Sequence, residues 1–188
     1  MQISEHLMFE RLAIPDVILF KHKPFKDDRG FFFESYQKER FDRGLEKNIT
    51  FMQDNHSQSS KGVLRGLHYQ LPPFAQAKLV RVTRGEVFDV AVDIRRSSPT
   101  FGHYVGTHLS EDNFHELYIP EGFAHGFVVL SERADFLYKT TAFYNQDSER
   151  LIRWDDPVLN IDWHFAGNKI LTPKDLAAPL FSQADCFE

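Results

Sequence analysis

Short segments in which apolar and polar residues alternate recur along the chain, and turn residues separate them. The clearest is Glu86–Ile94, where Phe88, Val90, Val92 and Ile94 would share one face of a strand. A period of two belongs to a β-strand, because a helix repeats every 3.6 residues. We expect about ten such strands with little helix, which predicts an antiparallel β-sandwich or barrel able to hold a small ligand in its mouth.

The expected strands are closely spaced. They cover 14–21, 31–36, 50–57, 63–70, 78–83, 86–94, 102–110, 115–119, 124–130 and 133–144. A short helix is expected over 37–44, ended by Gly44. The strands over 78–83 and 86–94 are predicted to form a hairpin across Arg84 and Gly85. No repeat, linker or composition change divides the chain, so residues 1–188 are predicted to form one domain.

The composition excludes several classes of protein. The net charge of −5 argues against a general nucleic-acid binder, which needs a basic face. The single cysteine, Cys186, rules out an intrachain disulfide. The first residues show no signal-peptide pattern, and no apolar run approaches the length of a membrane helix. We therefore expect a cytoplasmic protein without membrane or nucleic-acid partners.

The stretch GVLRGLHYQLPPFAQAK, residues 62–78, concentrates ionisable side chains among strand residues. His68 is a candidate proton acceptor, because a neutral imidazole titrates near pH 7; a buried structural histidine fits the local sequence equally well. Arg65 and Lys78 would need an anionic partner inside a barrel. Simple alternation places Arg65 and His68 on opposite strand faces, unless a bulge at Gly66 re-aims them.

The segment PEGFAH, ending at His125, has the form Pro-x-Gly-x-x-His and resembles the second half-motif of the cupin superfamily. The first half-motif of that superfamily supplies His-x-His and a later glutamate as metal ligands. The matching place here reads His68-Tyr69-Gln70, with no glutamate at the right distance. A catalytic metal usually needs three convergent ligands, so no metal site is expected.

Seven segments together carry a more specific resemblance. In chain order they are DRGFFFES, QDNHSQSSKGVLRGLHYQ, QAKLVRVTRGEVFDVAVDIR, SPTFG, YIPEGFAHGFVVLS, YKTTAFY and ERLIRWDDP. From about residue 14 to 179 the chain resembles the dTDP-4-dehydrorhamnose 3,5-epimerase family. No single segment is specific, but their combination is. The resemblance implies a mainly β, antiparallel double-stranded β-helix, a jelly-roll or cupin-like barrel with a few short helices.

The resemblance also implies an isomerase and its residues. The substrate would be dTDP-4-keto-6-deoxyglucose, and the product dTDP-4-dehydro-L-rhamnose, for rhamnose-containing glycans such as lipopolysaccharide. By the family pattern, His68 is the base, Asp175 holds it through Nδ1, Lys78 stabilises the enolate, and Tyr138 is the acid on the other face. A positive charge beside a keto oxygen stabilises the enolate as it forms, and the carboxylate fixes the imidazole as in hydrolase triads. No cofactor is implied.

Substrate binding would involve a larger set, for which a diphosphate favours arginine. By the resemblance this set is Arg29, Glu34, Gln53, Asp54, Asn55, Arg65, Lys78, His125, Tyr144, Glu149 and Lys174. The family is homodimeric, and exposed sheet edges are consistent with a dimer. Arg29 and Glu34 are candidates to reach a partner's site.

Three alternatives stay open from the residues. The first is an epimerase that inverts only C3 or only C5 in another deoxysugar pathway. The second is a metal-dependent cupin, against which the His68-Tyr69 pair argues. The third is a non-catalytic sugar-nucleotide barrel, against which the presence of both His68 and Asp175 argues.

Overall fold

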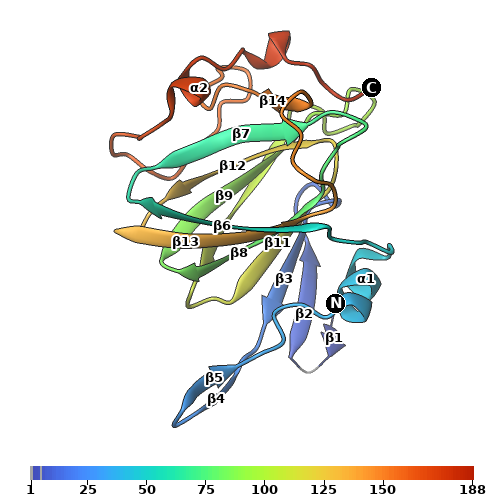
Figure 1. Ribbon diagram of the computed structural model, residues 1–188, viewed down its shortest axis with the longest axis vertical. Helices are drawn as coiled ribbons and strands as arrows, with labels where there is room; N and C mark the ends of the chain where they lie inside the picture. The colour runs from blue at the N-terminus through green and yellow to red at the C-terminus, as the bar shows by residue number, and fades with distance from the viewer. Residues whose placement is uncertain (1, 5) are drawn as a thin grey trace.

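Two antiparallel sheets face each other in the computed structural model, which describes residues 2–4 and 6–188 (Figure 1). The larger sheet has the order β1 (Gln2–Ser4), β2 (Leu7–Arg11), β3 (Ile18–His22), β11 (His115–Ile119), β8 (Lys78–Arg84), β13 (Arg133–Thr140) and β6 (Gln53–Ser60). The smaller has the order β10 (Tyr104–Ser110), β9 (Glu86–Asp93), β12 (Phe123–Val129), β7 (Leu64–Gln70) and β14 (Glu149–Leu151). The expected mainly β, jelly-roll class is therefore confirmed.

The remaining elements are short. They are a small hairpin of β4 (Phe25–Asp27) and β5 (Gly30–Phe32), helices α1 (Lys38–Leu45) and α2 (Pro173–Leu176), and the 3₁₀ turn η1 (Phe181–Gln183). No helix within the described residues is long and apolar enough to cross a bilayer.

Each sheet buries both of its faces over part of its area. Between the sheets, Val80 and Phe136 of the larger sheet pack with Ala91 and Phe127 of the smaller. The outer face of the smaller sheet is covered by the C-terminal segment, including Trp163. The outer face of the larger sheet has its own apolar cluster, into which α1 packs. The alternation in β9 is therefore real, but its polar face points into the molecule rather than into water.

The predicted hairpin across Arg84 and Gly85 is wrong. Strands β8 and β9 belong to different sheets: β8 pairs with β11 and β13, whereas β9 pairs with β10 and β12. Gly85 has a φ of 76°, and a Cβ there would lie 2.0 Å from the Arg133 carbonyl oxygen. This glycine lets the chain cross from one sheet to the other, and the local sequence pattern looks the same for either connection.

Several predicted boundaries also move. The strand expected over 31–36 is only three residues long in β5, and the strand expected over 133–144 ends at Thr140. Strand β2 was not predicted. The helix expected to end at Gly44 continues to Leu45, and its C-cap Glu46 takes the left-handed conformation. Its N-cap is Gln37, whose side chain accepts a hydrogen bond from the Arg40 backbone.

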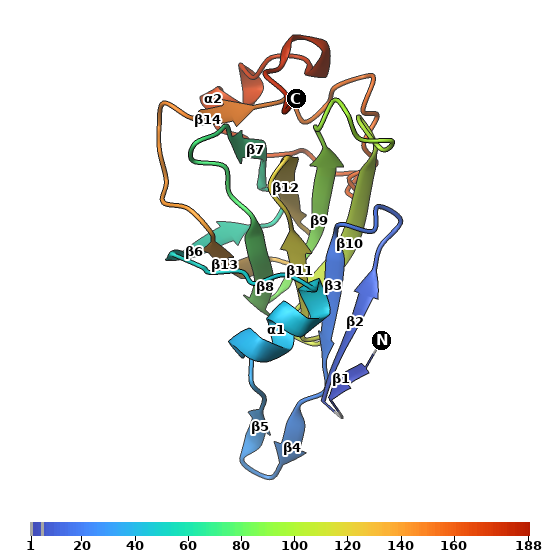
Figure 2. The same ribbon diagram turned by 90° about the vertical axis from the view of Figure 1, so that its right-hand side faces the viewer.

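The hairpin β4–β5 projects from one end of the molecule, and α2 lies at the other end (Figures 1 and 2). Phe25, Phe31 and Phe32 of this hairpin are 53%, 60% and 67% exposed. Such large apolar side chains in water usually mark a contact surface.

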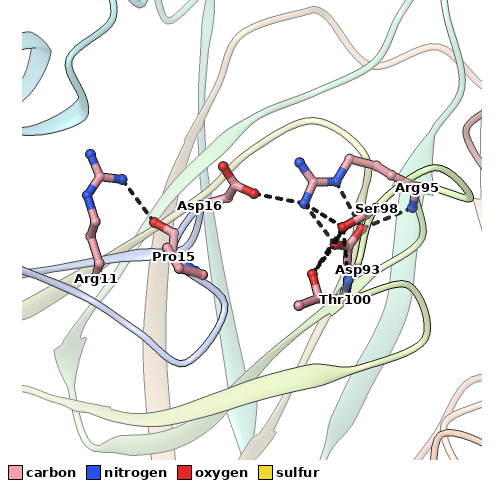
Figure 3. A network of polar contacts seen from close by, with 7 residues as sticks. All are labelled: Arg11, Pro15, Asp16, Asp93, Arg95, Ser98 and Thr100. Atoms are coloured by element: carbon pink, nitrogen blue, oxygen red, sulfur yellow. Dashed lines mark hydrogen bonds and ion pairs between the residues drawn. The ribbon is translucent and has the colours of Figure 1, made fainter.

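A charged network closes the end of β9 (Figure 3). Asp93 is fully buried and accepts hydrogen bonds from the Arg95 side chain, from Ser98 Oγ at 2.6 Å and from Thr100 Oγ1 at 2.6 Å. Arg95 also donates to Asp16 at 2.8 Å. Burial alone would raise the pKa of Asp93, but these donors lower it to about 2. The network ties the loop after β9 to the loop before β3.

We predict that Asp93→Asn lowers the free energy of unfolding at pH 7 by about 2 to 4 kcal/mol. The folded-state pKa of Asp93 is below that of an unfolded aspartate, about 3.9. The stabilisation from its charge is therefore present above that value and is lost as the pH falls towards 2. Urea unfolding at pH 7, 5 and 3 should show the difference between wild type and variant shrinking at pH 3.

The matched control is Asp155→Asn, because Asp155 pairs with Arg153 at the exposed surface. That change should alter the unfolding free energy by less than about 1 kcal/mol. A difference for Asp93→Asn that stays the same from pH 7 to pH 3 would contradict the role given to its charge.

Candidate active site

One extra residue in β7 brings Arg65 and His68 to the same face of the smaller sheet. Phe127 of β12 is paired with Arg65, and His125 of β12 is paired with His68. Two steps along β12 therefore match three steps along β7, with the irregularity at Gly66. Residues two apart on a strand share a face, so Arg65 and His68 both follow their partners inward. The bulge considered from the sequence is present.

Gly66 is the residue that this bulge requires. Its backbone φ angle is 135°, which residues other than glycine rarely adopt. A Cβ at this position would lie 2.5 Å from the Cα of Gly126 and 3.0 Å from the His125 carbonyl oxygen. The two strands can approach this closely only because both positions are glycine.

His68 and Asp175 form a hydrogen-bonded pair across 107 positions of sequence. Nε2 of His68 lies 2.6 Å from Oδ1 of Asp175. The expectation that the carboxylate binds Nδ1 is wrong, because the contact is made by Nε2. The Asp175 side chain is almost completely buried, whereas that of His68 keeps about a third of its surface exposed. The pair therefore leaves Nδ1 of His68 as the nitrogen that can exchange a proton with a ligand.

The N-terminus of α2 holds the carboxylate of Asp175. Thr172 Oγ1 donates to Oδ2 of Asp175 at 2.6 Å, and the Thr172 backbone N–H reaches the same oxygen at 3.3 Å. In return the Asp175 backbone donates to Thr172 Oγ1, which completes a capping box. Burial raises the pKa of Asp175, but the bonds from His68 and Thr172 outweigh it and lower the pKa below its ordinary value. The carboxylate is therefore ionised at neutral pH.

Lys78 begins β8 in the opposite sheet and is only 9% exposed. Its ammonium group donates to the carbonyl oxygen of His68 at 3.3 Å. Burial lowers the pKa of Lys78 to about 8, and the nearby carboxylates of Asp89 and Glu149 oppose that shift. Lys78 is still mainly protonated at pH 7, so it places a positive charge beside the His68 backbone.

A second histidine–carboxylate pair lies on the neighbouring strands. Nε2 of His125 lies 3.0 Å from Oδ1 and 2.9 Å from Oδ2 of Asp89. Asp89 is fully buried and His125 is 7% exposed. Sequence reasoning included His125 but missed Asp89. The signal was present, since Asp89 is a carboxylate on the polar face of the most regular alternating strand.

Tyr138 lies in the middle of β13, with its ring near Phe136 in the inner core. Burial raises the pKa of its hydroxyl, the charge of Arg65 lowers it, and that of Glu149 raises it. The phenol therefore remains protonated at neutral pH and can donate a proton. Arg65 is held by a hydrogen bond to the larger sheet, since its Nε donates to Ser59 Oγ of β6 at 3.1 Å.

A chain of polar contacts connects the remaining residues near the dyad. Glu149 Oε2 accepts from Lys174 Nζ at 2.5 Å and from the Tyr144 hydroxyl at 2.8 Å. Gln53 accepts a hydrogen bond from the Tyr144 backbone and donates to Asn55 Oδ1. Asn55 is the cross-strand partner of Tyr138, so this chain runs from α2 to the inner face of β6 and β13.

Three of the predicted binding residues lie away from this group. Arg29 is in the turn of the projecting hairpin, where it pairs with Asp27 and its side chain is 90% exposed. Glu34 pairs with Arg40 of α1. Asp54 turns outward on β6 and binds Lys139 at 2.9 Å. The described residues contain no group of three or more His, Cys, Asp or Glu side chains placed to hold a metal ion.

Comparisons with known proteins agree on one family. The family model described as dTDP-4-dehydrorhamnose 3,5-epimerase matches residues 11–183. A dTDP-4-dehydrorhamnose 3,5-epimerase of Pseudomonas aeruginosa is 59% identical, over 94% of this chain and 97% of that protein.

Solved structures extend this likeness. A dTDP-6-deoxy-D-glucose-3,5-epimerase from Legionella pneumophila, in complex with dTDP-4-keto-L-rhamnose, superposes with a TM-score of 0.93 at 50% identity. The match covers 96% of this chain and 95% of that one. A 3'-monoepimerase from Streptomyces bikiniensis, in complex with dTDP-quinovose, superposes with a TM-score of 0.87 at 29% identity, over 92% and 87% of the two chains.

The capping box at α2 yields a prediction about the dyad. Thr172→Val keeps the shape of the side chain but removes the hydroxyl, so we expect a loss of about 1 kcal/mol in the free energy of unfolding. Asp175 loses one of its two side-chain partners, and the proton in the His68–Asp175 hydrogen bond should exchange faster with water. Proton NMR of that downfield resonance, with urea unfolding, measures both effects. Thr172→Ser retains the hydroxyl and should preserve both; an unchanged resonance in Thr172→Val would contradict the coupling.

Proposed function

The chain belongs to the dTDP-4-dehydrorhamnose 3,5-epimerase family, and we propose that it inverts carbons 3 and 5 of dTDP-4-keto-6-deoxyglucose with the residues around His68. The observation that carries this proposal is the hydrogen bond between His68 and a buried, ionised Asp175. It supplies a base with a fixed orientation beside the positive charge of Lys78.

The chemistry follows from the keto group at carbon 4. Carbons 3 and 5 both flank this group, so the C–H bond at each is acidified. Nδ1 of His68 takes the proton while Asp175 holds the other ring nitrogen and stabilises the imidazolium that forms. The ammonium group of Lys78 offsets the negative charge that develops on the keto oxygen. The absence of a metal requirement stays a prediction, which metal analysis of the active protein tests.

Reprotonation needs an acid on the other face of the sugar ring. Tyr138 belongs to β13 of the larger sheet, whereas His68 belongs to β7 of the smaller sheet. Burial keeps the Tyr138 phenol protonated, and an enolate is basic enough to take its proton. Arg65, Glu149, Lys174 and Tyr144 form the proposed contacts for the diphosphate and the nucleoside.

An epimerase acting at one carbon is the second candidate. It is favoured by the likeness to the 3'-monoepimerase, which shares the fold at lower identity. The higher identity to the 3,5-epimerases supports inversion at both carbons.

We further propose that the chain works as a homodimer in which Arg29 and Glu34 reach the partner's site. The hairpin that carries Arg29 projects from the end of the molecule opposite α2, and three phenylalanines expose large parts of their rings on it. In water these rings favour contact with another surface.

Solvent exchange tests the base and the acid together. With dTDP-4-keto-6-deoxyglucose in deuterated water, His68→Asn should reduce deuterium incorporation at carbons 3 and 5 by at least about 10³-fold, because the base is lost. Tyr138→Phe should still incorporate deuterium but lose the inverted product, because only the acid is missing. NMR of the sugar reports both results and the number of carbons that react.

The control for this experiment is His103→Asn, since His103 is exposed and lies at the end of β10 away from the dyad. It should react like the wild type. Exchange at the wild-type rate in His68→Asn would remove this residue as the base, and unchanged inversion in Tyr138→Phe would remove that residue as the acid.

Mixed dimers test the exchange of Arg29 between subunits. Arg29→Ala should weaken activity about tenfold by losing a charge-assisted contact with the nucleotide. Co-assembled His68→Asn and Arg29→Ala subunits should regain about a quarter of the wild-type activity, because half of the dimers contain one intact composite site. No gain on mixing, or a mass of one copy by light scattering, would contradict the proposal.

A further inference from the structure

The pair formed by His125 and Asp89 has no role in the proton transfers described above. Both residues face inward, because each lies two positions from apolar residues of the inner core on its own strand. His125 lies directly across from His68 in the strand pairing. Nε2 contacts both carboxylate oxygens of Asp89, at 3.0 and 2.9 Å. The second ring nitrogen, Nδ1, has no hydrogen-bond partner among the described residues, yet it keeps some accessible surface.

The charges around the pair determine its protonation state. Asp89, Lys78 and His125 are all at least nine-tenths buried. Burial raises the pKa of Asp89, whereas the hydrogen bond and charge of His125 and the charge of Lys78 lower it. Protonated Lys78 balances the charge of Asp89. A proton added to His125 would leave two cations beside one carboxylate in a site that water barely reaches. Burial accordingly lowers the pKa of His125, so this imidazole is neutral at pH 7.

A neutral imidazole that contacts a carboxylate has one possible arrangement of its proton. Nε2 lies almost equally far from the two oxygens of Asp89, which is the geometry of one N–H group shared by two accepting carboxylate oxygens. An ionised carboxylate only accepts hydrogen bonds, so Nε2 carries the hydrogen. Nδ1 is then an unprotonated acceptor. We propose that Asp89 is a positioning residue that fixes His125 in this tautomer, so that Nδ1 accepts a hydrogen bond from a ring hydroxyl of the sugar.

This proposal rests on the proposed function and deepens it by naming what His125 recognises. A keto oxygen is only an acceptor, so it gains nothing from an unprotonated Nδ1. A hydroxyl group is a donor and is complementary to it. The site thus separates its tasks: Lys78 faces the developing enolate oxygen, and His125 identifies a hydroxyl on the same ring. A sugar that lacks this hydroxyl leaves a buried acceptor unpaired, which is strongly unfavourable.

Nitrogen-15 NMR of the resting wild-type protein tests the tautomer without any assay of activity. The His125 resonances are identified by their loss in His125→Asn. At pH 7 we expect Nδ1 to have the shift of an unprotonated nitrogen and Nε2 that of a protonated one. A protonated Nδ1, in either the other tautomer or an imidazolium, overturns the proposal. The outcome does not depend on whether the chain proves to be an epimerase.

Asp89→Asn tests the role of the carboxylate. Its amide can donate to Nε2, which reverses the tautomer and turns Nδ1 into a donor, while size is preserved. We expect kcat/KM to fall by about 10- to 100-fold. In a His125→Ala background the same change should cost clearly less, because the part of the effect that passes through His125 is already lost and only the charge balance with Lys78 remains. An equal loss in both backgrounds overturns the proposal.

Analogues that lack the hydroxyl at carbon 2 or at carbon 3 complete the test. The wild type should discriminate against one of them by at least about tenfold in kcat/KM, and Asp89→Asn should lose most of that discrimination. Discrimination that is equal in the two proteins overturns the proposal. If the wild type turns over no 4-keto sugar at all, the proposed function fails instead, and the NMR result still decides the tautomer.

Discussion

Charged groups are buried between two apolar sheets. The interior is stable only because these groups pair with groups of opposite charge. Lys78, Asp89 and His125 are nearly or fully buried, in a region otherwise packed with residues such as Ala91 and Phe127. An isolated charge there would be strongly destabilising. The negative charge of Asp89 balances the positive charge of Lys78. Nε2 of each of the two histidines contacts a carboxylate, that of Asp175 for His68 and that of Asp89 for His125. The same compensation that makes the interior stable also prepares it for a charged reaction.

The second requirement is the approach of segments that are distant in sequence. Asp175 reaches His68 from the C-terminal segment that also covers the outer face of the smaller sheet. Tyr69, the neighbour of His68, donates its hydroxyl hydrogen to the backbone of Asp185 at 2.6 Å. The inner and outer faces of β7 are therefore coupled: the outward residue anchors the tail, and the tail returns a carboxylate to the inward residue.

The sequence predicted the class of fold because the alternation in strands such as β9 is local and regular. It did not predict that β8 and β9 belong to different sheets, because a Gly-containing turn has the same sequence pattern in a hairpin and in a connection between two sheets. The inward position of Asp89 was missed because a polar face suggests water, whereas here tail and opposing sheet cover both sides. Lys78, His68 and Asp175 could be named through the family resemblance. Asp175 contacts Nε2 of His68 rather than Nδ1 because of the position of α2, and no local sequence pattern predicts that position.

The proposed base and acid stand on opposite sheets, so the separation of the sheets limits how far apart the two reacting groups can lie. Packed sheets lie about 10 Å apart, a gap set by the side chains between them. Phe127 and Phe136 stack across this gap with ring centroids 4.1 Å apart. Neither residue has a part in the proposed proton transfers, yet their bulk helps to set the spacing of the two sheets that carry the proposed base and acid. The size of these core side chains therefore affects the spacing between the proposed base and acid, in addition to the stability of the fold.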